Sequence, residues 1–431
     1  MGFRFTNPWW AVFGAVTGLF VCNGPVLGFT FGVFLKPIMA DTGWQRSSVS
    51  FALSVGGIFS ALAVPVLGRM MDRWGIRCVM LPGLVVYAIC LSLVGAISAS
   101  FWIFTLVFAV AEMTSAIQTP LGYAKAISAW FDRRRGLALG IAMAGVGLGG
   151  SVIPQLANTL IERIGWRGAY ASLALLTFLI AFPAVALWIR DPRPGEGEQH
   201  VTFSAAELSG ITSREAVGLS RFWVLAAVFF LVALAINGTV AHVIPLLTDR
   251  GFSHDTATAI FGLFGLATLG GRLLAGYMVD RIFAPHVASV FFLVPIAGFV
   301  FLASAAGPLP AVGVVLFGLG LGTEIDLIAF MVSRYFGQRS FGELYGYFLM
   351  VFGLGSSFGR FLGGYIFDLT GSYNAAFIGA GVALVIGILL VNRLGAYAYP
   401  VRLHHAATGR GGGHLSTCFS CRWWSRGGSN P

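Results

Sequence analysis

The chain has 431 residues, of which 57% are hydrophobic and only 10% are charged. Soluble domains carry about 25% charged residues, so this composition nearly excludes a water-soluble enzyme. The excess of 27 Lys and Arg over 17 Asp and Glu would suggest a nucleic-acid partner in a soluble protein. In a membrane protein the same excess records topology, because cytoplasmic loops collect basic residues. We therefore expect a lipid bilayer around the chain and no nucleic-acid partner.

Apolar runs separated by short polar segments predict an all-α membrane protein with twelve transmembrane helices, since a span needs about 20 apolar residues. The first run begins at Trp9 and is long enough to remain as a span, so no cleavable signal peptide is expected. The expected spans are residues 9–35, 46–70, 78–98, 101–126, 136–160, 168–190, 221–247, 256–280, 286–306, 309–333, 343–367 and 373–394.

One long polar segment, rich in Pro, Gly and Glu, separates the sixth span from the seventh and is typical of a linker. The sequence therefore predicts four parts: an N-terminal six-helix half (1–190), a cytoplasmic linker (191–220), a C-terminal six-helix half (221–398) and a disordered basic tail (399–431). Cys418 and Cys421 in the tail have zinc-like spacing, but a second ligand pair is missing. We expect neither a metal nor a cofactor.

The basic residues predict the orientation of the chain. With the N-terminus inside, most of the 27 Lys and Arg fall on the cytoplasmic side. The outer side then holds Lys36, Arg46, Arg163, Arg167 and Arg250. This asymmetry places both termini in the cytoplasm. Short loops and the lack of an organelle-targeting signal favour a bacterial inner membrane, and we expect a monomer.

A G-x-x-x-D-R motif occurs twice, at cytoplasmic helix ends after the second and the eighth spans. Its Gly lets helices approach closely, its Asp can bond a neighbouring helix N-terminus, and its Arg anchors the inner face. Corresponding positions in the two halves strengthen the interpretation of these residues as a gating loop motif: Gly68, Asp72, Arg73, Gly276, Asp280 and Arg281.

A second repeated string, R-x-x-x-G-x-x-x-D, occupies residues 272–280 and 360–368. The two copies lie on the eighth and eleventh spans, which run in opposite directions, as an inverted three-helix repeat would produce. Each Arg lies roughly 12 Å along its helix from the terminal Asp. Both Arg272 and Arg360 are therefore expected close to the membrane midplane.

These motifs resemble those of the major facilitator superfamily, over about residues 8–395. Within it, the chain resembles the monocarboxylate transporter and oxalate:formate antiporter group in three stretches: F-G-V-F-L-K at 31–36, G-W-Q-R-S at 43–47 and W-F-D-R-R-R-G-L-A at 130–138. The resemblance implies a secondary transporter, not an enzyme, with a central cavity between two halves that works by alternating access. No phosphate-binding G-x-x-x-x-G-K-[ST] loop is present, so ATP is not the expected energy source.

The resemblance also implies that Arg272 binds the substrate carboxylate, since a basic residue of the eighth span does so in that group. A guanidinium offers two parallel donors to a carboxylate. The alternative is a structural ion pair with Glu324 or Asp326. Arg360 is expected to be a second cationic contact, suited to a dianion, and its alternative is an ion pair with an acid on another helix.

Three acidic residues are candidates for the coupling proton. Glu324 and Asp326 are two positions apart, about 200° around a helix, so they cannot both face one cavity. One of them is expected to neutralise an Arg, and the other to take up a proton. Glu112 in the fourth span is the rival for that role, and a purely structural carboxylate is the alternative for each.

Four uncharged residues complete the expected substrate site: Asn23, Phe29, Gln118 and Asn237. Many animal monocarboxylate transporters have a Lys where this chain has Phe29, and an Asp where it has Thr268. Their lactate–proton mechanism therefore cannot be transferred, and Phe29 would suit an apolar part of a larger substrate. We expect transport of a small organic anion, a mono- or dicarboxylate, by proton symport or exchange. The alternatives are a neutral or vitamin-like metabolite, drug efflux, or a non-transporting sensor.

Overall fold

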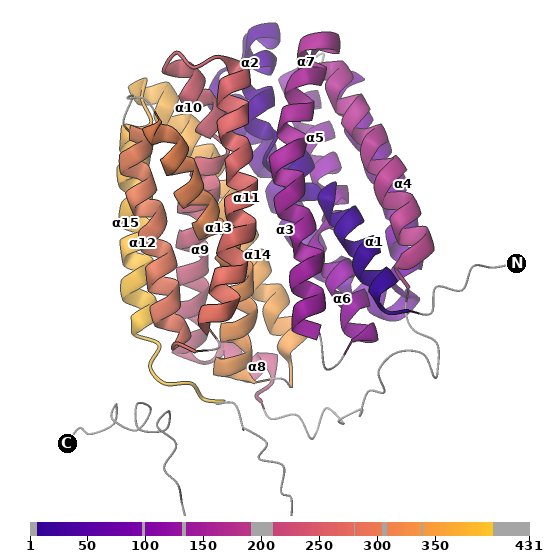
Figure 1. Ribbon diagram of the computed structural model, residues 1–431, viewed down its shortest axis with the longest axis vertical. Helices are drawn as coiled ribbons and strands as arrows, with labels where there is room; N and C mark the ends of the chain where they lie inside the picture. The colour runs from indigo at the N-terminus through magenta and orange to yellow at the C-terminus, as the bar shows by residue number, and fades with distance from the viewer. Residues whose placement is uncertain are drawn as a thin grey trace, which may run out of the picture. The chain divides into compact units, whose positions relative to one another are not determined.

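The computed structural model describes residues 7–96, 100–131, 135–190, 210–279, 281–303, 308–337 and 339–399, without the side chains at positions 72, 128, 135 and 136. Most of the expected linker, the expected tail beyond Tyr399, and Asp280 lie outside the described residues. The described part is a bundle of helices within one compact unit (Figure 1). An isolated bridge between Gly210 and Gly337 is its one β feature among these residues. The all-α membrane fold is thus confirmed.

The helices of the N-terminal half are α1 (Trp9–Phe20), η1 (Gly24–Gly28), α2 (Phe31–Thr42), α3 (Arg46–Trp74), α4 (Ile76–Ala96), α5 (Phe101–Ser115), η2 (Ala116–Gln118), α6 (Pro120–Trp130) and α7 (Arg135–Trp188). Those of the C-terminal half are α8 (Ser213–Val217), α9 (Ser220–Val240), α10 (Val243–Asp249), α11 (His254–Val279), α12 (Ala284–Ala303), α13 (Leu309–Phe336), α14 (Phe341–Thr370) and α15 (Asn374–Asn392). We use "half" for residues 7–190 and 210–399. The predicted division into two six-helix domains remains a prediction.

Three of the expected spans are interrupted. The first changes from α1 to the π-helical turn η1 at Gly24-Pro25, where proline has no N–H to donate. The fourth breaks at Thr119, whose extended backbone (φ −74°, ψ 162°) is the conformation favoured before Pro120. The seventh breaks between α9 and α10. Such breaks bring backbone and polar side chains to the interior of a membrane protein where a cavity can accept them.

Helix α7 is a hairpin of two passes. Its backbone leaves the helical conformation at Gly165 (φ 72°, ψ 167°). A Cβ added at Gly14 of α1 would lie 2.7 Å from Cβ of Trp188, and one added at Gly145 would lie 2.3 Å from the carbonyl oxygen of Val16. A straight helix would separate residues 145 and 188 by about 65 Å, so both ends of α7 can reach α1 only if the chain reverses.

Helix α14 packs lengthwise against two apolar spans, α3 and α9. Along α3 it pairs Gly353 with Ala61 and Gly364 with Ser50, so these two helices are antiparallel. By length and hydropathy, ten helices of the described residues could cross a membrane, with the α7 hairpin counted once and α14 not included. Taking α7 as two passes and α14 as one agrees with the predicted twelve, although length and hydropathy alone do not establish that number.

The two halves meet along α3 and α14 and along α7 and α11. At the second contact, a Cβ added at Gly265 of α11 would lie 2.4 Å from the carbonyl oxygen of Gly147 of α7. The backbones can approach this closely because neither position has a side chain. The site described next lies between these two contacts.

Candidate functional site

A cavity of about 300 Å³ is lined by residues of both halves. Cavities that hold small molecules start at about this size. Its walls are mainly apolar, with a few polar and charged groups. All six residues that the sequence predicts as substrate contacts line it: Asn23, Phe29, Gln118, Asn237, Arg272 and Arg360. Their roles in binding remain predictions, but the tertiary structure brings them together.

Arg272 lines the cavity and also forms the ion pair that the sequence offered as the alternative to substrate binding. Its side chain lines the cavity and is only 8% exposed, and its Nη1 atom lies 3.6 Å from Oδ1 of Asp326. The same Nη1 atom makes no hydrogen bond. Nη1 of Arg272 therefore faces an ionic partner at 3.6 Å but makes no hydrogen bond, so it can still donate one.

Arg360 is held differently. Its Nε atom donates to the carbonyl oxygen of Ser356 at 3.2 Å, and its Nη2 atom donates to Oγ of the same residue at 2.9 Å. Among the described side chains, no carboxylate lies within ion-pair distance of this guanidinium. The ion pair with an acid on another helix, which the sequence offered as the alternative, is not found.

Two of the three acidic candidates line the cavity, each held by an asparagine. Asn23 donates to Oε2 of Glu112 at 3.1 Å, and Asn237 donates to Oε2 of Glu324 at 3.2 Å. In both glutamates the Oε1 atom is buried and makes no hydrogen bond. Asp326 is not among the lining residues, in agreement with the expected rotation between Glu324 and Asp326.

Gln118 and Phe29 occupy the uncharged wall. The Oε1 atom of Gln118 accepts a hydrogen bond from the hydroxyl of Tyr123 at 2.7 Å, while its buried Nε2 group has no partner. Phe29 packs edge-on against Phe264, with ring centroids 5.2 Å apart. The wall thus offers an unused amide donor and an aromatic surface.

Sequence reasoning missed some of the lining residues. Ser356, which fixes Arg360, lies one helical turn before it, so the i, i+4 spacing was a usable signal. Tyr345 gives no such signal, because it reaches the cavity only through the packing of α14.

None of the described residues of the repeated G-x-x-x-D-R motif lines the cavity. A Cβ added at Gly68 would lie 3.5 Å from Leu121, an ordinary contact, and one added at Gly276 would meet nothing within 4 Å. The expected close approach of helices is therefore not found at either glycine. Arg73 is exposed, and Arg281 donates to the carbonyl oxygen of Tyr277 at 3.0 Å and lies over its ring. The side chain of Asp72 and all of Asp280 lie outside the described part, and the gating role remains a prediction.

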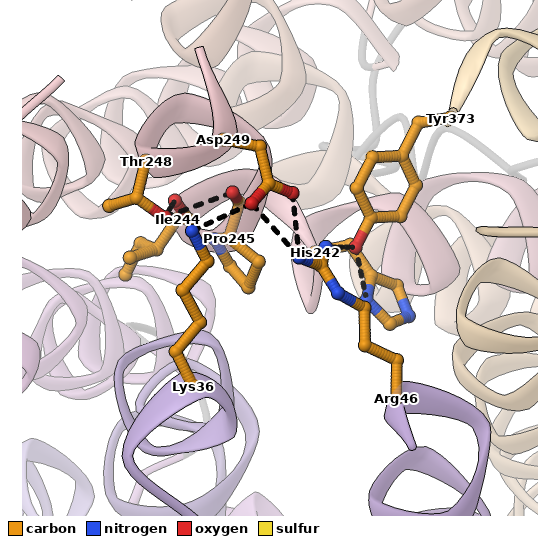
Figure 2. A network of polar contacts seen from close by, with 8 residues as sticks. All are labelled: Lys36, Arg46, His242, Ile244, Pro245, Thr248, Asp249 and Tyr373. Carbon is orange, nitrogen blue, oxygen red and sulfur yellow. Dashed lines mark hydrogen bonds and ion pairs between the residues drawn. The ribbon is translucent and has the colours of Figure 1, made fainter. Parts of the chain in front are cut away.

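At one end of the bundle an ion-pair cluster joins the two halves (Figure 2). Asp249 of α10 forms two ion pairs. Its Oδ1 atom lies 2.7 Å from Nζ of Lys36 of α2, and its Oδ2 atom lies 2.7 Å from Nη2 of Arg46 of α3. Lys36 and Arg46 belong to the N-terminal half and Asp249 to the C-terminal half. This contact fastens the halves at the end where α2 and α10 lie, at the top of Figure 1.

The cluster continues toward the cavity through a chain of hydrogen bonds. Arg46 donates to the hydroxyl of Tyr373 at 2.7 Å, and this hydroxyl lies 3.3 Å from Nδ1 of His242 (Figure 2). Nε2 of His242 lies 2.9 Å from the carbonyl oxygen of Arg360. A carbonyl can only accept, so His242 donates from Nε2 and accepts from Tyr373 at Nδ1. We name Lys36, Arg46, His242, Asp249 and Tyr373 the Asp249 network.

The cavity extends away from the Asp249 network. Its lining includes Leu121 of α6, Met143 near the start of α7 and Tyr345 near the start of α14. Helices α6 and α8 lie at the bottom of Figure 1, at the end of the bundle opposite α2 and α10. One end of the space between the halves is therefore bridged by charges, and the cavity reaches toward the other.

A family model described as "Major Facilitator Superfamily" matches residues 9–359. The chain belongs to the major facilitator superfamily. Among curated proteins it is 27% identical to human "Monocarboxylate transporter 11" over 80% of this chain and 73% of that protein. It is 24% identical to "MFS-type transporter 1" of an Ophiocordyceps species, over 89% and 84% of the two chains.

Solved structures show the same fold. A nucleoside transporter, NupG, aligns with a TM-score of 0.68 at 14% identity, over 91% of this chain and 99% of that chain. A bacterial homologue of the human lysosomal transporter Spinster, solved in an inward-facing and unoccupied conformation, aligns with a TM-score of 0.65 at 16% identity, over 91% and 96%. The predicted family is confirmed, and the chain is a multi-pass membrane transporter, not an enzyme.

Proposed function

We propose that this transporter moves a small organic anion, a mono- or dicarboxylate, by alternating access with proton symport or anion exchange. One observation carries the proposal: Arg360 lines the cavity and has no carboxylate partner among the described residues. Arg360 is half-buried in a mainly apolar wall, and a charge withdrawn from water is costly unless it is paired. An anionic substrate would supply the missing partner.

The unused donors around Arg360 support a carboxylate in particular. Nη1 of Arg272 and Nε2 of Gln118 are buried without hydrogen-bond partners and belong to residues that line the same cavity. Carboxylate oxygens accept several hydrogen bonds each, and those from charged donors are the strongest. Similarity to human monocarboxylate transporter 11 favours the same substrate class.

The Asp249 network supports alternating access. It closes the space between the halves at one end, while the cavity reaches toward the other. A transporter of this family must exchange such a closure from one end to the other during each cycle. From the distribution of Lys and Arg we propose that the network lies on the outer side, with both termini in the cytoplasm of a bacterium and the chain a monomer in the inner membrane.

Proton coupling would use the buried glutamates of the cavity. Glu112 and Glu324 line it, whereas Asp326 is already paired with Arg272. Anion exchange would need only the two arginines, because one anion would replace another. The two modes therefore differ in whether the glutamates are needed for net uptake.

The proposal is tested by uptake of radiolabelled lactate, pyruvate, oxalate and succinate into proteoliposomes with an imposed inward proton gradient. We expect saturable uptake of at least one of them, which Arg360→Gln and Arg272→Gln reduce at least tenfold, as loss of a charge-assisted hydrogen bond of about 1.5 kcal/mol or more implies. Arg163→Gln is the matched control, since Arg163 is exposed and lies outside the cavity.

Absence of carboxylate flux in folded native protein would overturn the proposal. Flux of a neutral metabolite or a drug that survives loss of both arginines would favour those alternatives. Ligand binding without any flux would favour a sensor.

A further inference from the structure

The cavity contains the same pair of side chains twice. In the N-terminal half Asn23 donates to Glu112, 89 residues away in the sequence, and in the C-terminal half Asn237 donates to Glu324, 87 residues away. In each half an Asn of the first span holds a Glu of the fourth span on the same oxygen, Oε2. The matching separations and bonds show that the two halves repeat this arrangement.

Each glutamate is enclosed so that a proton on it would be stable. Glu112 is 2% exposed and Glu324 is 0% exposed, and neither forms an ion pair among the described residues. The Oε2 atoms already accept an amide hydrogen, while the Oε1 atoms have no partner. A carboxylate here would be an unpaired buried charge, whereas a carboxylic acid with its proton on Oε1 carries none.

The groups around the glutamates set when a proton can leave. Tyr87 of α4, Tyr170 of α7 and Arg360 of α14 lie within electrostatic range of Glu112. Glu324 shares the cavity wall with Arg272 of α11 and Tyr345 of α14, and Asp326 of its own helix is held by Arg272. The charged groups near both glutamates are thus the two cavity arginines and one acid that is already paired.

We propose that Glu112 and Glu324 are two matched proton sites, one in each half, that bind their protons together with the anionic substrate and release them together with it. The inference rests on the proposed function and makes two protons the coupled ions. Asn23 and Asn237 are positioning residues that leave Oε1 of each glutamate free to carry the proton.

The arginines provide the coupling. When the substrate carboxylate neutralises Arg360 and Arg272, an ionised glutamate nearby would have no compensating charge, so both glutamates hold protons. When the substrate leaves, the arginines can stabilise ionised glutamates, and each proton passes from Oε1 to water in the cavity. Binding of the anion and protonation of the two glutamates therefore stabilise each other.

The first test counts carboxylic acids directly, without a substrate. Infrared difference spectra of native protein between acidic and alkaline pH should contain C=O bands of two protonated carboxyl groups. Glu112→Gln and Glu324→Gln should each remove one contribution, and the double variant should remove both. Glu162→Gln is the matched control, because Glu162 also accepts a hydrogen bond from an asparagine, Asn158 at 3.1 Å, but on an exposed helix position.

The second test counts transported protons. The ratio of protons to oxalate or lactate is obtained from the pH gradient at which net flux in proteoliposomes reverses, with the membrane potential clamped at zero. We expect two protons per anion in native protein and in Glu162→Gln, one in each single variant and none in the double variant. Glutamine keeps an oxygen that can accept from the asparagine, so these variants should fold, which thermal unfolding would check.

Three results would overturn the inference: no carboxylic band that the double variant removes, a ratio that the single variants leave unchanged, or a native ratio of one that depends on only one glutamate. If no carboxylate is transported, the proposed function fails, and the infrared spectra still decide whether the two sites carry protons.

Discussion

The Nη1 atom of Arg272 lies 3.6 Å from Oδ1 of Asp326, between the neighbouring helices α11 and α13. The contact joins two side chains of unequal exposure, 8% for Arg272 and 38% for Asp326. The charge of Arg272 is therefore shared with a protein carboxylate, whereas Arg360 has no carboxylate partner in the described part of the chain and donates to Ser356.

This difference predicts unequal effects of removing the two arginines. Arg360→Gln should raise the KM for a transported carboxylate tenfold or more, as loss of about 1.5–3 kcal/mol of charged hydrogen bonding implies. Arg272→Gln should have the smaller effect on KM, because the charge of Arg272 is already shared with Asp326. Initial uptake rates against concentration measure both, and a larger KM change for Arg272→Gln would contradict the assignment.

The same ion pair should be visible in stability. Asp326→Asn and Arg272→Gln are each expected to lower the midpoint of thermal unfolding in detergent, and the double variant should lose less than their sum. We expect a coupling energy of about 1 kcal/mol, because the pair is long and one partner is half-exposed. Additive effects would show that the contact does not stabilise the fold.

The Asp249 network should control access from its end of the bundle. Asp249→Asn removes the partner of both Lys36 and Arg46 and should favour opening there. Cys22 is a buried thiol that lines the cavity. Opening at this end should speed its alkylation by a membrane-impermeant maleimide added on that side. The matched control is Asp41→Asn, which breaks an ion pair with Arg167 inside one half. Equal labelling rates in native protein and Asp249→Asn would exclude this role.

The Asp41–Arg167 pair predicts a dependence of stability on pH. The Arg167 guanidinium and the indole N–H of Trp166 donate to Asp41 and hold the pKa of its carboxyl below its usual range. A group with a lowered folded-state pKa stabilises the fold above its unfolded pKa, about 4, and stops doing so as the pH falls through its folded value. The difference in unfolding temperature between native protein and Asp41→Asn should shrink on acidification below that range. A difference that is independent of pH would contradict the pairing.

The contact between α7 and α11 requires Gly265. An added Cβ would lie 2.4 Å from the carbonyl oxygen of Gly147 and 2.4 Å from the backbone nitrogen of Ser151. Gly265→Ala should therefore destabilise the bundle by about 1–3 kcal/mol and slow transport, since overpacking separates the helices. Gly270→Ala on the same helix is the control, because a Cβ there makes only an ordinary contact, 3.8 Å from Leu319. Similar unfolding temperatures for the two variants would refute the close contact.

Much of the architecture could be predicted from composition and from the spacing of apolar runs along the chain. Apolar runs of about 20 residues specify membrane helices whatever their neighbours, since the bilayer acts on each run separately. The helix α14 shows the limit of this signal. Hydropathy does not mark it as a span, yet its glycines pack closely against α3 and α9, so only packing places it within the bundle.

Part of the candidate site could likewise be predicted from the sequence. The repeated R-x-x-x-G-x-x-x-D string sufficed to predict that Arg272 and Arg360 lie near one depth, and a polar residue inside an apolar run is a functional candidate because its burial is costly. All six substrate candidates, together with Glu112 and Glu324, line one cavity. The break at Thr119-Pro120 also had a local signal, the proline itself, which disfavours a helical conformation in the residue before it.

The partner of each buried charge was decided by tertiary structure alone. Depth along a helix follows from sequence position, but which side chain faces which depends on the rotation and spacing of helices distant in the chain. Hence Asp326 pairs with Arg272, Glu324 with Asn237, and Asp249 with Lys36 and Arg46 across the two halves. The amino-acid sequence by itself determined that charges are buried in a membrane transporter, and only the packing of its helices determined that Arg360 has no carboxylate partner among the described residues.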